Sequence, residues 1–206
     1  MIPIGKKGKS SNINLIQPLT LVEFEADIRE NIQIHQLKNL RISKPLHHIH
    51  FDPVKSAIIM FLDELLYKTI PDDYVNDTLF KYLHNAIVLL DDAFDARNFH
   101  LWCLLEISRQ YGFYPQFESE NAHHFFDLSS STYVCDRPTH PHYLEEIESA
   151  ILLLMLDKEW PQVQTIAMSG IMRKNLLDAL VKYIRLHLEN LREIHSVEIL
   201  HEVFHG

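Results

Sequence analysis

The hydrophobic period of the chain changes near Pro45, so any fold must accommodate two different kinds of segment. Ahead of Pro45, apolar and charged residues alternate, which is typical of a strand with one buried face. The apolar members are Val22, Phe24, Ala26 and Ile28. After Asp52-Pro53 the apolar residues recur at helical spacing instead. We therefore predict an α+β chain, with strands in residues 1–45 and a mostly α-helical domain in residues 46–206.

The strand region contains the pattern of a hairpin. A second alternation begins at Ile32 and Ile34 and slips phase before Leu40 and Ile42, which indicates a β-bulge. Residues 29–31 are compatible with the turn between the two strands. Two strands are too few to make a sheet that is stable alone.

The helical region carries several start and stop signals. Asp52 is a good N-cap followed by proline at the first helical position, and a second helix is expected to open near Asn76 or Asp77. A third helix over about residues 97–111 would end at Gly112. The remaining expected elements are a hairpin of short strands at residues 125–128 and 132–135, and helices at about residues 142–156, 171–188 and 197–204.

Composition limits the function classes. The formal net charge of −9 argues against a chain that coats nucleic acid indiscriminately, since phosphate binding depends on lysine and arginine. Any contact with DNA must come from a local basic patch. Cys103 and Cys135 are the only cysteines and lie far apart, which favours a reducing cytoplasm. No apolar run is long enough for a membrane span, and the basic start is not followed by the apolar run of a signal peptide.

Motifs for catalysis and metal binding are missing from the sequence. Fourteen histidines include the cluster His47, His48 and His50, but C-x-x-C and H-E-x-x-H spacings are absent, so we expect no metal. Five glycines leave no phosphate-cradling loop, and G-x-S-x-G is also absent, so we expect no cofactor and no enzyme activity. The acid pair Asp91-Asp92 falls at a helix end and is interpreted as structural.

Basic residues gather in two places. The first set is Lys6, Lys7, Lys9, Lys38, Arg41 and Lys44. A basic loop beside a strand surface can follow a phosphate backbone, although a solvated loop explains these lysines equally well. The second set is Arg173, Lys174, Lys182 and Arg185 on the last long helix. Lys174, Lys182 and Arg185 share one face of this helix with the acidic Asp178 and Glu189, so a solvated helix face is the better interpretation there.

The run Gln-Pro-Leu-Thr-Leu-Val-Glu-Phe-Glu-Ala at residues 17–26 opens a series of characteristic segments. The others are residues 53–58, 61–67, 98–101, 111–115, 137–138, 142–144 with Glu148, 173–177, 183–188 and 196–204. This series is collinear, covers nearly the whole chain and resembles the RecO family, particularly its Bacteroidetes-like branch. Residues 17–26 are similar to a barrel strand of that family.

This resemblance implies an N-terminal OB-type barrel, here partial, followed by an α-helical domain. It implies a non-enzymatic recombination mediator of the RecF pathway, at the nucleoid in the cytoplasm. Such a protein binds single- and double-stranded DNA, anneals strands, associates with RecR, docks the C-terminal tail of single-stranded-DNA-binding protein and promotes RecA loading. The loop with Lys6, Lys7 and Lys9 corresponds in position to a basic barrel loop of relatives. Arg173 and Lys174 are the candidates for docking the acidic, partly apolar tail.

The chain departs from the family pattern in two ways. Many members carry a four-cysteine zinc element, and residues 118–135 stand in its place here without it, so we expect no zinc. The barrel is also expected to lack its first strands, with Met1 either an internal methionine or the start of a truncated chain. Two alternatives remain open: a helical protein-interaction module whose DNA binding has decayed, and a histidine-rich metalloenzyme.

Overall fold

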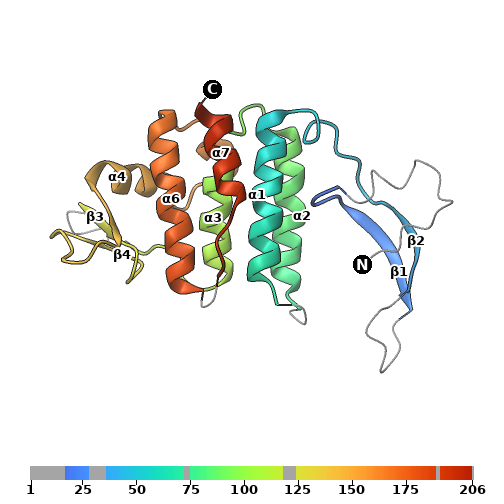
Figure 1. The fold of residues 1–206 in the computed structure, drawn as a ribbon, viewed down its shortest axis with the longest axis horizontal. Coiled ribbons are helices and arrows are strands. Elements are labelled where there is room, and N and C mark those ends of the chain that lie inside the picture. Colours follow the sequence, from blue (N-terminus) through green and yellow to red (C-terminus); the bar gives the residue numbers. More distant parts are fainter. Residues whose placement is uncertain (1–16, 28–35, 72–74, 118–123, 189–190, 206) are drawn as a thin grey trace.

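A computed structural model describes residues 17–27, 36–71, 75–117, 124–188 and 191–205 of the chain. A body of side-by-side helices carries a β-hairpin at one end and a small three-stranded sheet at the other (Figure 1). The described residues form no closed barrel. The predicted mixture of helices and antiparallel strands is therefore confirmed, whereas the OB-type barrel is not.

The described part of the chain contains seven helices. They are α1 (Pro53–Thr69), α2 (Asp77–Asp92), α3 (Phe99–Gln110), α4 (Glu146–Met155), α5 (Trp160–Val163), α6 (Gly170–His187) and α7 (Ser196–His205). The C-terminal helix α7 packs against both α1 and α6, and α3 contacts α1, α2 and α6. These helices form the body in Figure 1, while α4 lies against the small sheet.

Local signals in the sequence set the helix boundaries. The Asp52 side chain accepts the backbone N–H of Val54 at 2.8 Å, and Pro53 occupies the first position of α1. Asn76 caps α2, and Gly112 follows α3 with a φ of 84°. All three predicted boundaries are confirmed. By contrast α5 was not predicted, because a single helical turn is too short to show a hydrophobic period.

The hydrophobic core lies inside the helical body. The largest fully buried side chains include Phe61, Ile58 and Leu65 of α1, Leu90 of α2, Leu101, Leu104 and Leu105 of α3, and Tyr183 of α6. Burying each such side chain contributes roughly 1.5–3 kcal/mol. The helices therefore supply most of the hydrophobic stabilisation.

Strands β1 (Val22–Asp27) and β2 (Gln36–Ile42) pair antiparallel. The register shifts opposite Phe24, where β2 has one extra residue and Asn39 adopts a φ of 54°. The predicted bulge is confirmed and lies in β2. The predicted turn at residues 29–31 falls outside the described residues.

The expectation of a buried strand face was wrong for this hairpin. Phe24, Leu37 and Ile42 are 50%, 43% and 39% exposed, because the hairpin extends away from the helices (Figure 1). Just ahead of β1, Leu21 is buried in the core and Leu19 packs against it. Alternation in a strand indicates which residues share a face, and packing against the rest of the molecule decides whether that face is covered.

The second sheet has the strand order β4-β3-β5, with β3 (Phe125–Asp127), β4 (Thr132–Val134) and β5 (Tyr143–Leu144). The predicted hairpin of β3 and β4 is confirmed. The helix predicted from residue 142 begins only at Glu146, because Leu144 pairs with Phe126 of β3 instead. No helix in the described ranges combines the length and apolar character needed to cross a membrane.

Candidate functional site

The β1–β2 hairpin has one apolar and one charged face. Residues directly opposite each other in an antiparallel pair share a face. The pairs Val22 with Ile42 and Ala26 with Leu37 are apolar. The pairs Glu23 with Arg41 and Glu25 with Lys38 carry the charges. The sequence therefore separates the two kinds of side chain cleanly, and the bulge keeps this separation along β2.

Both basic residues of β2 have acidic neighbours on β1. Arg41 donates a hydrogen bond to the Glu23 carboxylate, and the Lys38 ammonium lies 3.8 Å from Asp27. Arg41, Glu23 and Lys38 are exposed and Asp27 is partly exposed, so each pair contributes at most about 1 kcal/mol. A phosphate group could exchange with these carboxylates at little cost. The hairpin is thus a candidate nucleic-acid surface whose positive charges are partly compensated.

The other residues predicted to bind DNA are Lys44 and the three lysines of the basic loop. Lys44 is exposed just after β2, in the segment that leads to the helices. Lys6, Lys7 and Lys9 lie outside the described residues. The structure therefore brings together Lys38, Arg41 and Lys44 along one strand and its continuation.

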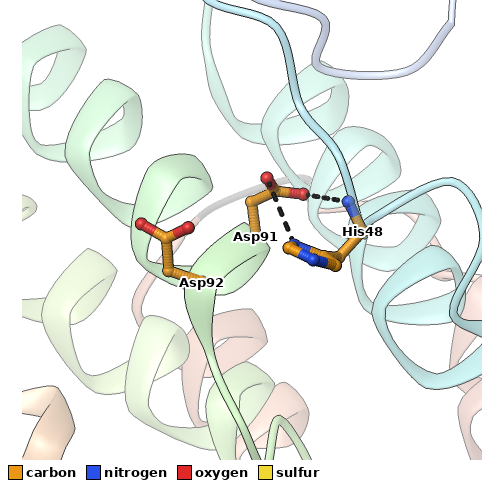
Figure 2. A group of neighbouring side chains, drawn as sticks. All are labelled: His48, Asp91 and Asp92. Carbon is orange, nitrogen blue, oxygen red and sulfur yellow. Dashed lines mark hydrogen bonds and ion pairs between the residues drawn. The ribbon is translucent and has the colours of Figure 1, made fainter.

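A buried aspartate fastens the segment after the hairpin to the helical body. Asp91, at the end of α2, is 4% exposed. Its carboxylate accepts the backbone N–H groups of His47, His48 and Ile49 at 2.8, 2.7 and 2.9 Å. Figure 2 shows the hydrogen bond from His48. Burial alone would raise the pKa of Asp91, but these three hydrogen bonds lower it below its ordinary value.

A buried lysine completes this attachment, which we call the Asp91 anchor. The Lys55 ammonium donates to the backbone carbonyl of Asp91 at 2.7 Å. Lys55 near the start of α1 and Asp91 at the end of α2 each lie at the helix end where the helix dipole disfavours their charge. Both nevertheless have hydrogen-bond partners, because Lys55 reaches α2 and Asp91 reaches the segment ahead of α1. Ser56 also donates to the carbonyl of the fully buried Ile49, at 2.7 Å. The hairpin therefore leaves the body from a fixed point.

Among the described residues, one group of three side chains could supply metal ligands, and it consists of His48, Asp91 and Asp92 (Figure 2). Their ligand atoms lie within 4.8 Å of one another. Both oxygens of Asp91 already accept backbone N–H groups, and His48 and Asp92 are exposed. The hydrogen bonds explain the buried carboxylate without an ion. We therefore assign this group to the Asp91 anchor.

The buried cysteine is unsuited to nucleophilic chemistry. Burial raises the pKa of the Cys103 thiol to about 12. The hydrogen bond that the Tyr82 hydroxyl donates to its sulfur, at 3.5 Å, acts in the opposite direction but does not offset the burial. The thiol is therefore protonated at neutral pH and packs as a small apolar group.

The two predicted partner-binding residues line one small pocket between α3, α6 and α7. Arg173 is 5% exposed, and its guanidinium donates to Asn98 Oδ1 at 3.1 Å and to the Met168 carbonyl at 3.3 Å. Lys174 is half-buried. The pocket lining is His100, Arg173, Lys174, Leu177, Leu200, His201 and Phe204. Arg173 does not belong to the helix face interpreted as solvated, and its burial was not predicted, because its partner Asn98 lies far away in the sequence.

Comparison with known proteins identifies the family. Residues 50–195 match the family described as Recombination protein O C terminal. The chain belongs to the RecO family. The DNA repair protein RecO of Bacteroides fragilis is 35% identical over 98% of this chain and 84% of its own length. The namesakes of Phocaeicola vulgatus and Flavobacterium psychrophilum are 33% and 32% identical, over 98% and 97% of this chain and 84% and 83% of their own lengths. No solved structure matches.

The RecO match relates directly to the geometry. It begins at His50, immediately after the segment held by Asp91, and runs through α1 to α6. The Bacteroides fragilis RecO protein also matches the hairpin, since its similarity spans 98% of the chain. RecO membership, predicted from collinear segments, is thus confirmed, and it supports a role in DNA repair and recombination.

Sequence reasoning missed the burial of two polar residues of this RecO chain, Asp91 and His100. Asp91 was interpreted only as part of an acid pair. An aspartate at the C-terminal end of a helix is disfavoured by the helix dipole, which indicates that a specific partner stabilises it. His100 stands between Phe99 and Leu101, and a histidine inside such an apolar run is a signal of burial.

Proposed function

We propose that the chain is a recombination mediator that binds DNA and proteins without carrying out chemistry. Its partners would be single- and double-stranded DNA, RecR and the C-terminal tail of single-stranded-DNA-binding protein, and its effect would be strand annealing and RecA loading in the RecF pathway. The site of action would be the nucleoid in the cytoplasm. The observation that carries this proposal is the RecO family match over the helical body, together with relatives that bear the name DNA repair protein RecO.

The hairpin is the proposed DNA-binding surface, as part of an OB-type barrel. Its apolar face, with Phe24 and Leu37 exposed, supports this because barrel strands keep such a face inward. Lys38, Arg41 and Lys44, joined by Lys6, Lys7 and Lys9, would then follow the phosphate backbone from the outer, charged face. DNA phosphates would replace Glu23 and Asp27 as their partners.

The helical body is the proposed protein-docking part. Docking of an acidic and partly apolar tail requires a cation beside an apolar slot. Lys174 and Arg173, next to Leu177 and Leu200, offer this combination.

Single substitutions on the hairpin test the DNA-binding surface. Lys38→Ala, Arg41→Ala and Lys44→Ala should each weaken binding of a single-stranded oligonucleotide several-fold, to a similar extent for different base sequences, since phosphate contacts carry no sequence information. Fluorescence anisotropy of a labelled oligonucleotide provides the measurement. Lys81→Ala, an exposed lysine on α2, serves as the matched control and should leave the affinity unchanged.

A second candidate is a protein-interaction module that no longer binds DNA. The ion pairs of Arg41 with Glu23 and of Lys38 with Asp27, on a chain of net charge −9, favour it. Capture of RecR or of single-stranded-DNA-binding protein, without measurable oligonucleotide binding, would select this candidate over the mediator.

A further inference from the structure

A cleft of about 530 Å³ lies between α2 and α3, and none of its residues belongs to the binding surfaces proposed above. Its apolar wall is formed by Tyr82, Ala86 and Leu89 of α2 and by Trp102 of α3. Ligand sites in proteins usually combine a cleft of this size, apolar walls and a small number of polar groups. We call it the α2–α3 cleft.

The loop ahead of α5 forms another side of the α2–α3 cleft and is held in place by hydrogen bonds. The indole N–H of Trp102 donates to the Lys158 carbonyl at 3.2 Å. The backbone N–H of Asp157 donates to the Tyr114 hydroxyl at 2.8 Å. Because these contacts fix the loop within the chain itself, a ligand does not have to order this wall when it binds.

The polar side of the cleft carries more negative than positive charge. Its carboxylates are Glu106, Asp157 and Glu159, and its cations are Arg109 and Lys158. Arg109 serves two of the three carboxylates, since its Nε lies 3.3 Å from Glu106 and its terminal nitrogen donates to Asp157 at 3.0 Å. One guanidinium is therefore divided between two anions.

Glu106 is the carboxylate that this arrangement compensates least well for its burial. Its side chain is only 19% exposed, whereas that of Asp157 is 61% exposed. Burial raises the pKa of the Glu106 carboxyl, and Glu159 and Asp157 add to this effect, while Arg109 opposes it. A further cation inside the cleft would stabilise the charged form of Glu106.

We propose that the α2–α3 cleft binds an arginine side chain of a partner protein. The guanidinium of that arginine meets the Glu106 carboxylate. Its aliphatic stem lies against the apolar wall at Leu89 and Trp102.

Arginine suits the cleft better than lysine does. A planar guanidinium stacks on aromatic rings and can bind a carboxylate through two parallel hydrogen bonds, whereas an ammonium group is a compact and strongly hydrated charge. The chain shows the same combination beside the cleft, where Arg109 lies 3.5 Å from the centroid of the Tyr114 ring and donates to Asp157. Aromatic and acidic groups are thus already arranged for guanidinium binding.

The charge of the cleft disfavours the ligands proposed for the other surfaces. DNA phosphates and an acidic peptide tail would both meet a surplus of negative charge there. The inference therefore goes beyond the proposed function, because it assigns a second protein contact with a ligand of opposite charge.

Two small probes of nearly the same shape test the cleft directly. Nα-acetylarginine amide carries the guanidinium, and Nα-acetylcitrulline amide has an uncharged urea in its place. In NMR titrations of the full chain at physiological salt, the arginine amide should bind about tenfold more tightly than the citrulline amide, since its hydrogen bonds to Glu106 are charge-assisted. The indole N–H resonance of Trp102 should shift during the arginine titration, because Trp102 lines the cleft.

Three variants make the test specific. Glu106→Gln removes the charge while almost preserving the shape, so it should abolish the preference for the arginine amide without lowering the thermal stability. Asp157→Asn should weaken arginine binding less than Glu106→Gln does, and asparagine tolerates the φ of 54° at this position. Glu198→Gln, at an exposed glutamate of α7, is the matched control and should leave both affinities unchanged.

Four results would overturn the proposal. They are equal affinities for the two amides, no binding of either at millimolar concentration, a preference for arginine that survives Glu106→Gln, and tighter binding of putrescine, which would assign the cleft to a free diamine. None of these titrations contains DNA, RecR or single-stranded-DNA-binding protein, so failure of the proposed mediator function would be seen separately.

Discussion

Single carboxylate side chains hold together segments that are distant in the sequence. The buried Asp91 fixes the segment at residues 47–49 to the end of α2 through three backbone N–H groups. The half-buried Glu64 of α1 does the same for the start of α7, since its carboxylate accepts hydrogen bonds from the N–H groups of His195 and Ser196. Each carboxylate therefore fixes a segment that leads into a helix.

Removing the Asp91 carboxylate should loosen the hairpin's attachment. Asp91→Ala leaves three backbone N–H groups without their acceptor, and we expect it to lower the free energy of unfolding by about 2–4 kcal/mol. Urea denaturation measures this decrease, and amide exchange at residues 47–49 should accelerate. Asp92→Ala changes the exposed neighbour and should cost less than about 0.5 kcal/mol. Equal effects of the two substitutions would contradict the anchor.

His100 should make the fold sensitive to acid. The ordinary pKa of histidine is about 6.5. In the folded chain burial, together with Arg173 and His201, holds the pKa of His100 at about 3, so between these values the unfolded chain binds a proton that the folded chain does not. Stability should therefore be full above about pH 6.5 and fall as the pH drops toward 3, by on the order of a few kcal/mol.

Comparison of the unsubstituted chain with His100→Leu isolates this contribution. The variant should lose stability less steeply between pH 6.5 and pH 4 in thermal unfolding. His124→Gln, at an exposed histidine, should preserve the steep dependence. Parallel curves for His100→Leu and the unsubstituted chain would show that His100 titrates normally.

At the scale of elements, the hairpin depends on one unusual backbone conformation. Asn39 has a φ of 54°, in the left-handed region that glycine and asparagine tolerate best. Asn39→Ala should cost about 1 kcal/mol, whereas Asn39→Gly should cost little. Since the residue is exposed, a change in packing cannot account for the difference. Hydrogen exchange of the β1 and β2 amides should accelerate about fivefold for alanine only; similar rates for both variants would contradict the bulge.

Elements were predictable from sequence where a local interaction decides them. The Asp52 and Asn76 caps and the turn at Gly112 each depend on a few neighbouring residues, and those boundaries were confirmed. The extent of β5 depends on pairing of Leu144 with Phe126, which no local pattern reveals. Burial of Arg173 likewise depends on Asn98, which reaches it only in the folded chain.

At the scale of the whole molecule, charge and apolar surface are distributed unevenly. The helical body buries most of the apolar side chains, while the hairpin exposes Phe24, Leu37 and Ile42 on one face and carries Lys38 and Arg41 on the other. Family membership could be predicted because collinear segments run through both parts. The DNA-contacting residues could not be decided in the same way, since Lys6, Lys7 and Lys9 lie outside the described residues.

The salt dependence of oligonucleotide binding tests the mediator role most directly. A plot of log affinity against log salt concentration for the full chain should have a negative slope, because each phosphate that the protein neutralises releases counterions. Replacing Lys38, Arg41 and Lys44 together by alanine should make that slope shallower by about 0.7 for each phosphate that is no longer neutralised. Absence of binding in dilute buffer, or a slope that the triple substitution leaves unchanged, would contradict a DNA-binding hairpin.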